Sequence, residues 1–97
     1  MVTAENTKAE VMRLLETRFR KSRLSHIEVV EGADSDGQPS IDVRIVFRNG
    51  PAKDEMRYER HRLVDDLRTW LAMEGDDRFP YFSFLTEKDE KELSSQA

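Results

Sequence analysis

The chain contains no cysteine, which excludes disulfides, thiolate catalysis and cysteine-ligated zinc or iron–sulfur clusters built from its own residues. No apolar run approaches the ~20 residues that a membrane-spanning helix needs. Residues 1–5 lack the apolar core of a signal peptide. We therefore expect a soluble cytoplasmic protein that has no membrane partner and binds no cofactor.

Glycine and proline are scarce, and the 4 glycines are isolated from one another. No glycine-rich phosphate loop, nucleophile elbow or metal-ligand helix motif occurs in the sequence. Residues 34–37 (Asp-Ser-Asp-Gly) begin like a calcium loop, but no glutamate closes such a site downstream, so a hairpin turn accounts for them. The paired carboxylates lie on predicted solvated faces, where nothing separates their pKa values. We predict a protein that is not an enzyme and holds no metal.

The 97 residues are 37% hydrophobic and 37% charged, with a net charge of −4. Their length and periodic apolar pattern indicate one folded domain over residues 1–93, followed by a disordered tail over residues 94–97. The negative net charge disfavours a nonspecific polyanion binder, although it leaves room for a local basic patch.

The apolar periodicity of the first half predicts one helix and two strands. A first helix is expected over residues 7–23, where Thr7 and Glu10 have capping-box spacing. Alternating side chains predict strands over residues 26–31 and 41–48. The two strands should pair as a hairpin because only a short turn-rich loop separates them.

The second of these strands alternates apolar and polar residues, which is typical of a sheet that helices cover on one side only. Val46 is the one apolar residue on its polar side. Hairpin pairing is expected to bring Glu28 near Arg44 across the two strands.

Residues 54–73 form the clearest amphipathic pattern in the chain. The predicted buried stripe consists of Met56, Leu63, Val64, Leu67, Trp70 and Leu71. Arg60 is expected to lay its aliphatic stem along the edge of this stripe, while Tyr58 and Arg62 face away and His61 lies on the flank.

Gly75 is a natural stop for this helix. A third strand is predicted over residues 79–86, with an alternation that separates its aromatic side chains onto two faces. Thr86 and Asp89 again have capping spacing, which allows a short final helix to Leu93.

The order α-β-β-α-β predicts an α+β two-layer sandwich, in which a three-stranded mixed sheet carries two helices on one face. A right-handed crossover makes the third strand parallel to the second. The simplest arrangement then places the first strand between the other two. The second face of the sheet stays open and is a candidate surface for a partner or for dimerisation.

The open sheet face and the surface of the helix over residues 54–73 are the two candidate binding surfaces. The candidate binding residues are Arg44, Arg48, Arg60, His61, Arg62 and Tyr81. We expect a small non-enzymatic interaction module that binds a protein partner or itself. The alternative is a KH-like nucleic-acid binder that uses Arg44, Arg48, Arg60 and Arg62.

The run Arg60-His61-Arg62-Leu63-Val64, in a helix that follows the strand containing residues 25–30, resembles the BolA family. The resemblance covers most of the chain and implies a KH-like αββααβ fold. It also implies partnership with monothiol glutaredoxins around an iron–sulfur cluster and, in some members, DNA binding. Residues 78–81 lack the histidine that the family carries before its last strand, and the loop between the first two strands has neither cysteine nor histidine. The chain therefore resembles a glutaredoxin partner without cluster ligands of its own.

Overall fold

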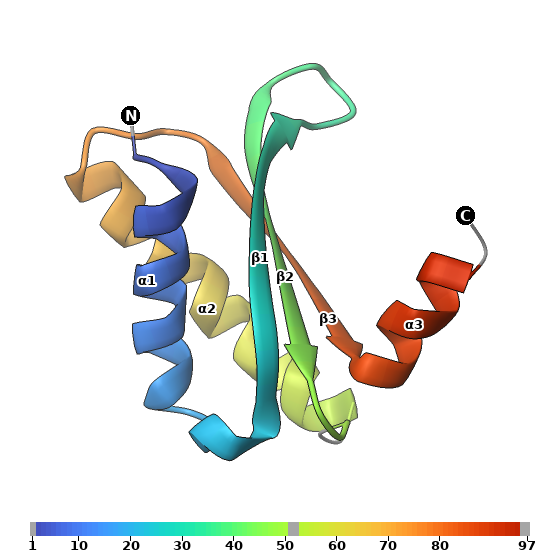
Figure 1. Cartoon of the computed structure of the whole chain (residues 1–97). Helices are drawn as coiled ribbons and strands as arrows, with labels where there is room; N and C mark the ends of the chain where they lie inside the picture. Colours follow the sequence, from blue (N-terminus) through green and yellow to red (C-terminus); the bar gives the residue numbers. More distant parts are fainter. Residues whose placement is uncertain (1, 51–52, 96–97) are drawn as a thin grey trace.

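A computed structural model describes residues 2–50 and 53–95 of the chain (Figure 1). The elements in order are α1 (Ala4–Glu16), the short 3-10 helix η1 (Lys21–Arg23), β1 (Leu24–Ala33), β2 (Pro39–Phe47), α2 (Lys53–Met73), β3 (Phe79–Thr86) and α3 (Glu87–Ser95). The protein is thus α+β, as predicted, with a three-stranded mixed sheet and a short last helix. The expected tail is helical at residues 94 and 95, and residues 96–97 lie outside the described part of the chain.

The strand order of the sheet is β1-β2-β3. β1 pairs with β2 antiparallel and β3 pairs with β2 parallel, so the predicted hairpin and the predicted parallel pair are both confirmed. The expectation that the first strand lies in the centre is wrong. A central strand is shielded by neighbours on both edges, and β2 carries the most completely buried apolar residues of the three strands: Ile41, Val43, Ile45 and Phe47.

The helices α1 and α2 cover one face of the sheet and enclose the core (Figure 1). α1 begins earlier than predicted, because Thr3 caps it by accepting a hydrogen bond from the backbone N–H of Asn6 on its Oγ1. The predicted cap, Thr7, is instead buried inside the helix, where its hydroxyl donates to the carbonyl of Thr3. α1 also ends at Glu16, and the basic residues that follow it form a turn and η1.

The predicted apolar stripe of α2 faces the sheet. Its fully or nearly fully buried members are Met56, Leu63, Leu67 and Leu71, and its partly buried members are Val64 and Trp70. Gly75 has a φ of +76°, a left-handed conformation that glycine adopts without steric cost, and the N–H of Asp76 then donates to the carbonyl of Leu71. No helix within the described ranges is long and apolar enough to cross a membrane.

α3 leaves the end of β3 on the side of the sheet opposite α1 and α2 (Figure 1). Its N-terminus has the predicted reciprocal cap: the N–H of Asp89 donates to the hydroxyl of Thr86, and the N–H of Thr86 donates to the carboxylate of Asp89. α3 contacts β2 and β3 and covers one end of this second face. This cover explains Val46, which is completely buried although it lies on the side of β2 that faces away from the core helices.

Candidate interaction surface

The second sheet face remains open beyond the end that α3 covers. Strand register aligns its side chains in rows across β1, β2 and β3, which read Gly32–Ser40–Phe79, Val30–Asp42–Tyr81, Glu28–Arg44–Ser83 and His26–Val46–Leu85. The two rows at the hairpin end carry the large apolar side chains of Val30, Phe79 and Tyr81, and the next row carries the charged pair Glu28 and Arg44. In the row nearest α3, His26 lies beside the apolar residues Val46 and Leu85. The face therefore has two chemically different halves.

The apolar half is formed by Val30, Phe79 and Tyr81, which we call the Tyr81 patch. Val30 is 57% exposed, Tyr81 43% and Phe79 38%. The two aromatic rings pack against each other with centroids 4.9 Å apart, and Arg68 of α2 reaches over the ring of Phe79 at 5.0 Å. The patch thus offers aromatic and aliphatic surface whose shape is already fixed by internal contacts.

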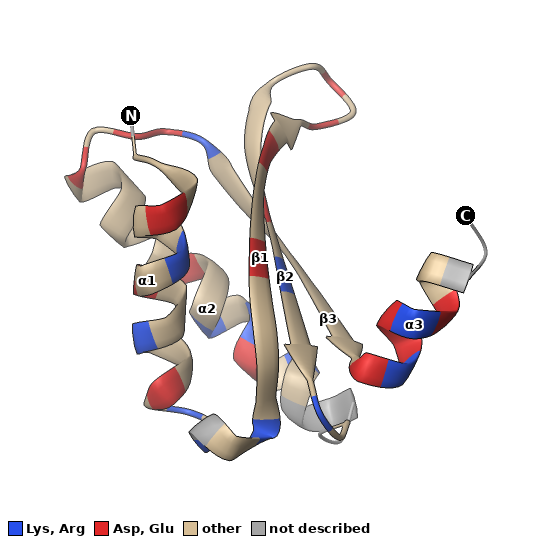
Figure 2. Cartoon of the chain, in the orientation of Figure 1, with Lys and Arg blue, Asp and Glu red and all other residues tan. Residues whose placement is uncertain are grey.

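Carboxylates surround the Tyr81 patch. The hydroxyl of Tyr81 donates to Asp34 of the hairpin loop at 3.4 Å. Partial burial and the negative charges of Asp34, Asp36 and Asp42 raise the pKa of Tyr81. Asp34 is itself fixed, because its other carboxylate oxygen accepts the backbone N–H groups of Asp36 and Gln38. Figure 2 shows this acidic loop at the tip of the hairpin, where its carboxylates favour a positively charged group beside Tyr81.

The charged half lies between the Tyr81 patch and α3. Arg44 and Glu28 form the predicted cross-strand pair, with 3.6 Å between Arg44 Nη1 and Glu28 Oε2. Both side chains are about half exposed, so the pair adds little to stability. The carboxylate of Glu28 does offset the positive charge of Arg44 on this face, because a ligand farther away than the pair meets nearly equal and opposite charges.

The structure divides the sequence-predicted binding residues among separate surfaces. Arg44 and Tyr81 share the open sheet face. Arg48 follows β2 and donates from Nε to the carbonyl of Leu24 at the start of β1. Arg62 lies on the outer surface of α2, where its guanidinium stacks on Tyr58 at 4.8 Å and donates to the tyrosine hydroxyl at 2.9 Å.

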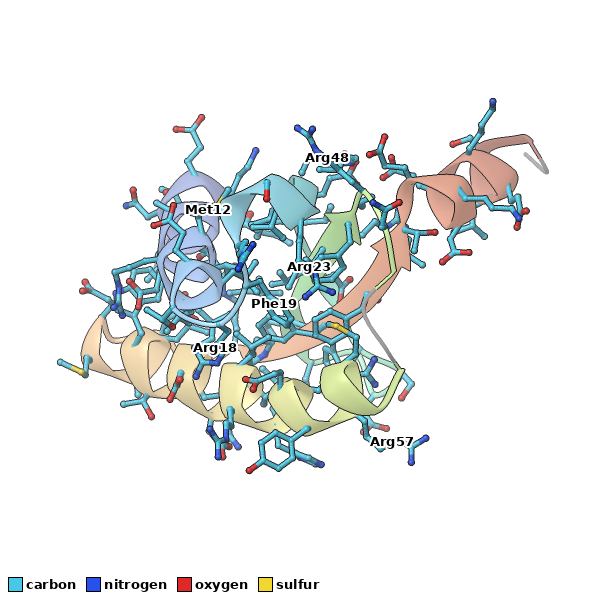
Figure 3. The ribbon with its side chains drawn as sticks, turned by 90° about the horizontal axis from the view of Figure 1, so that it is seen from below. Met12, Arg18, Phe19, Arg23, Arg48 and Arg57 are labelled. Carbon is cyan, nitrogen blue, oxygen red and sulfur yellow. The ribbon has the colours of Figure 1, made fainter. Side chains whose placement is uncertain are left out.

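Arg60 and His61 line a cavity of about 630 Å³ between α2 and the end of β3. Phe84 contributes an aromatic wall, and the guanidinium of Arg60 lies over its ring at 5.2 Å. Arg57 adds a second guanidinium to the rim of this cavity, and the carboxylate of Asp89 lines it as well. In Figure 3, Arg48 lies near the top of the view and Arg57 near the bottom, with Arg23 between them.

The sequence analysis named Tyr81 as a candidate binding residue. It did not name the other two residues of the Tyr81 patch, Val30 and Phe79, or the nearby carboxylates of Asp34 and Asp42. The alternation of β1 does predict that Val30 points to the open face. The approach of Asp34 and Asp42 to Tyr81 depends on β3 lying next to β2, which local patterns do not specify.

No protein-family model, curated protein or solved structure matches the chain. The resemblance to the BolA family therefore stays a prediction.

Proposed function

We propose that this protein is a non-enzymatic interaction module that binds a basic, apolar-flanked segment of another protein on its Tyr81 patch. The observation that carries the proposal is the combination of exposed Val30, Phe79 and Tyr81 with the carboxylates of Asp34 and Asp42 around them. Apolar surface favours burial by a partner, and the surrounding negative charge favours a partner that carries Lys or Arg beside apolar side chains.

Tyrosine at the centre of such a patch is a favourable anchor, since tyrosine is enriched among the residues that dominate binding energy. The ring of Tyr81 is held by Phe79 on one side and by the hydrogen bond to Asp34 at its tip. Little conformational entropy remains to be lost when a partner covers it. The outer surface of α2 supports the proposal less well, because its exposed Tyr58 is already stacked under Arg62.

The chain offers a matched pair of variants for a test, because Tyr81 and Tyr58 are its 2 tyrosines and both are exposed. Peptides selected from a random display library against the full chain are measured by fluorescence anisotropy. Enriched peptides are expected to contain Lys or Arg next to apolar residues. Tyr81→Ala is expected to weaken their binding by about 30-fold or more, the scale of a dominant interface residue. Tyr58→Ala is expected to leave the affinity unchanged.

Two outcomes would contradict the proposal. One is a library that yields no peptide bound above background. The other is a set of peptides whose affinity Tyr58→Ala reduces as much as Tyr81→Ala does. Affinity that falls with added salt supports the electrostatic part of the proposal, because salt screens the attraction between the acidic surround and a basic peptide.

The cavity beside α2 supports a second candidate function, binding of single-stranded nucleic acid at Arg57, Arg60 and His61. The guanidinium groups of Arg57 and Arg60 attract phosphates, and a base could stack on the ring of Phe84 once Arg60 moves off that ring to contact a phosphate. A salt titration with single-stranded RNA and DNA tests it. Arg60→Ala is expected to abolish low-salt binding and Arg62→Ala, on the outer side of α2, to preserve it. An absence of affinity at low salt would exclude this candidate.

A further inference from the structure

A second group of side chains lies at the border between the open sheet face and α3, next to the Val30 edge of the Tyr81 patch. His26 and Glu28 point to the same face of β1, because they are two residues apart on a strand. Glu90 of α3 reaches His26 from 64 residues away in the sequence, with 2.8 Å between Glu90 Oε2 and His26 Nε2. The fold thus joins an imidazole and two carboxylates that come from different elements.

We propose that His26, Glu28 and Glu90 form a binding site for a divalent first-row transition-metal ion such as Zn²⁺. One ligand atom from each side chain lies within 4.8 Å of the others. His26 Nε2 is 2.8 Å from Glu90 and 3.6 Å from Glu28. Ligands about 2.0–2.2 Å from a tetrahedral zinc ion lie about 3.4 Å from one another. The two separations from His26 Nε2 bracket this value, and the two carboxylate oxygens lie within 4.8 Å of each other, so the three atoms are close enough to share one ion after side-chain rotation.

Ser25 supports the histidine from the far side of its ring. Its hydroxyl oxygen lies 3.1 Å from His26 Nδ1. A carboxylate can only accept, so the contact of His26 Nε2 with Glu90 is a hydrogen bond that Nε2 donates. A metal ion bound at Nε2 would replace this proton, and Nδ1–H would then donate to Ser25. Outer hydrogen bonds of this kind orient metal-bound histidines and fix their tautomer. Ser25 is therefore placed to accept from Nδ1 when a metal ion occupies Nε2.

The nearby charges set the expected affinity. Glu28 also pairs with Arg44, and Lys88 and Lys91 lie close to His26 around the adjoining depression. These cations oppose a bound metal ion, while the two carboxylates neutralise its charge. The three ligand side chains are between 26% and 46% exposed, so water completes the coordination. A mixed imidazole and carboxylate set suits Zn²⁺, Co²⁺ and Mn²⁺ better than a purely thiophilic ion.

The site does not depend on the proposed function, because none of its residues belongs to the Tyr81 patch. It also differs from the expectation that the chain holds no metal. That expectation followed from the absence of a helical ligand motif, whereas here two ligands come from one strand and the third from a helix that folds back over it.

Isothermal titration of the tag-free full chain with ZnCl₂ near neutral pH tests the proposal. The expected result is saturable binding of one ion per chain. His26→Gln, Glu28→Gln and Glu90→Gln are each expected to weaken binding by at least the ~10–100-fold that loss of an outer-shell partner costs. His61→Gln is the matched control, because His61 is the second of the 2 histidines and lies on α2, outside the site. It is expected to bind zinc as the wild type does.

Further measurements separate metal ligation from a purely structural role. Arg44→Gln removes the competing partner of Glu28 and is expected to raise the affinity for zinc. Acid is expected to weaken binding, since a proton on His26 Nε2 excludes the ion. The proposal is overturned if the wild type shows no saturable binding, if any one of the three ligand variants retains full affinity, or if His61→Gln loses as much affinity as His26→Gln. Weaker binding by Arg44→Gln would also overturn it.

Discussion

Replacing Asp76 by Asn is expected to lower the free energy of unfolding by about 3 kcal/mol, the lower end of the cost of removing one partner from a buried ion pair. Asp76 lies just after α2, and its side chain is 1% exposed. Its two carboxylate oxygens accept hydrogen bonds from the guanidinium and backbone of Arg78 and from the backbone N–H of Val2. The amide of Asn keeps the shape and one acceptor oxygen, but it leaves the buried guanidinium of Arg78 without its nearest counter-charge.

Glu31 offers a control on the same guanidinium. Arg78 Nη1 donates to Glu31 Oε1 at 3.0 Å, but the Glu31 side chain is 54% exposed. Exposed pairs are worth roughly 0–1 kcal/mol, so Glu31→Gln should cost much less than Asp76→Asn. Both replacements remove one negative charge, which means that the change in net charge cannot explain a difference between them.

Urea unfolding monitored by Trp70 fluorescence measures both variants, since Trp70 is the chain's 1 tryptophan and packs against the core. Comparable slopes of free energy against urea would show that the same amount of surface unfolds in each protein. The reasoning is refuted if Asp76→Asn costs less than about 1 kcal/mol, the limit for an exposed pair, or if it costs no more than Glu31→Gln.

The same pair predicts the direction of a pH effect. Hydrogen bonds from the Arg78 guanidinium lower the pKa of Asp76 well below its ordinary value, although burial acts in the opposite direction. A carboxyl with a depressed folded-state pKa stabilises the fold fully above its unfolded pKa of about 3.9, and this contribution is lost as the pH falls further. The stability difference between wild type and Asp76→Asn should therefore narrow as the pH drops below about 4. A difference that stays constant down to acid pH would contradict this assignment.

Three further predictions concern the helices. Leu67→Ala, at a completely buried position of α2, should cost ~2–5 kcal/mol in urea unfolding, and a near-neutral result would show that α2 does not pack as described. Thr86→Ala removes the cap of α3 and should cost ~1 kcal/mol, seen as faster amide exchange in α3, whereas equal exchange rates would contradict a capping role. Gly75→Ala should lower the free energy of unfolding by ~1–2 kcal/mol, because the left-handed φ of Gly75 disfavours a residue that has a Cβ. Gly75→Asn should cost less, since Asn tolerates this conformation better, and the reverse order would argue against a purely backbone effect.

The elements that follow strong local patterns could be predicted from the sequence. The limits of β3 and the capping pair of Thr86 and Asp89 were predicted correctly, because both depend on residues close together in the chain. The cap of α1 was placed at Thr7 instead of Thr3. The spacing of a capping box is a local signal, and it cannot register that tertiary packing buries Thr7.

Strand order and the candidate sites depend on contacts between distant segments. Alternation separated Tyr81 from Phe82 and Phe84 and made Tyr81 a candidate binding residue, but the carboxylates around Tyr81 come from the hairpin and from β2. The exception in the alternation, Val46, was the one local sign that something covers that end of the sheet. The covering element, α3, also delivers Glu90 to His26, and no pattern within β1 could have indicated a third ligand there.

The two proposed sites occupy one sheet face, yet they should behave independently. Tyr81 stands opposite Asp42, and His26 stands opposite Val46. Four residue steps along β2 therefore separate Tyr81 from His26, about 13 Å at the usual rise of a strand, whereas Glu28 lies only two steps, about 7 Å, from Val30. The spacing of about 13 Å exceeds the screening length of about 8 Å at physiological salt, so a bound metal ion should act only weakly on the carboxylates around Tyr81 and more strongly near Val30. A metal ion would instead act on α3, since it would join Glu90 to the sheet through two ligands of β1. Zinc that protects the amides of α3 from exchange without changing peptide affinity at the Tyr81 patch would fit both proposals, and the failure of one site would leave the evidence for the other intact.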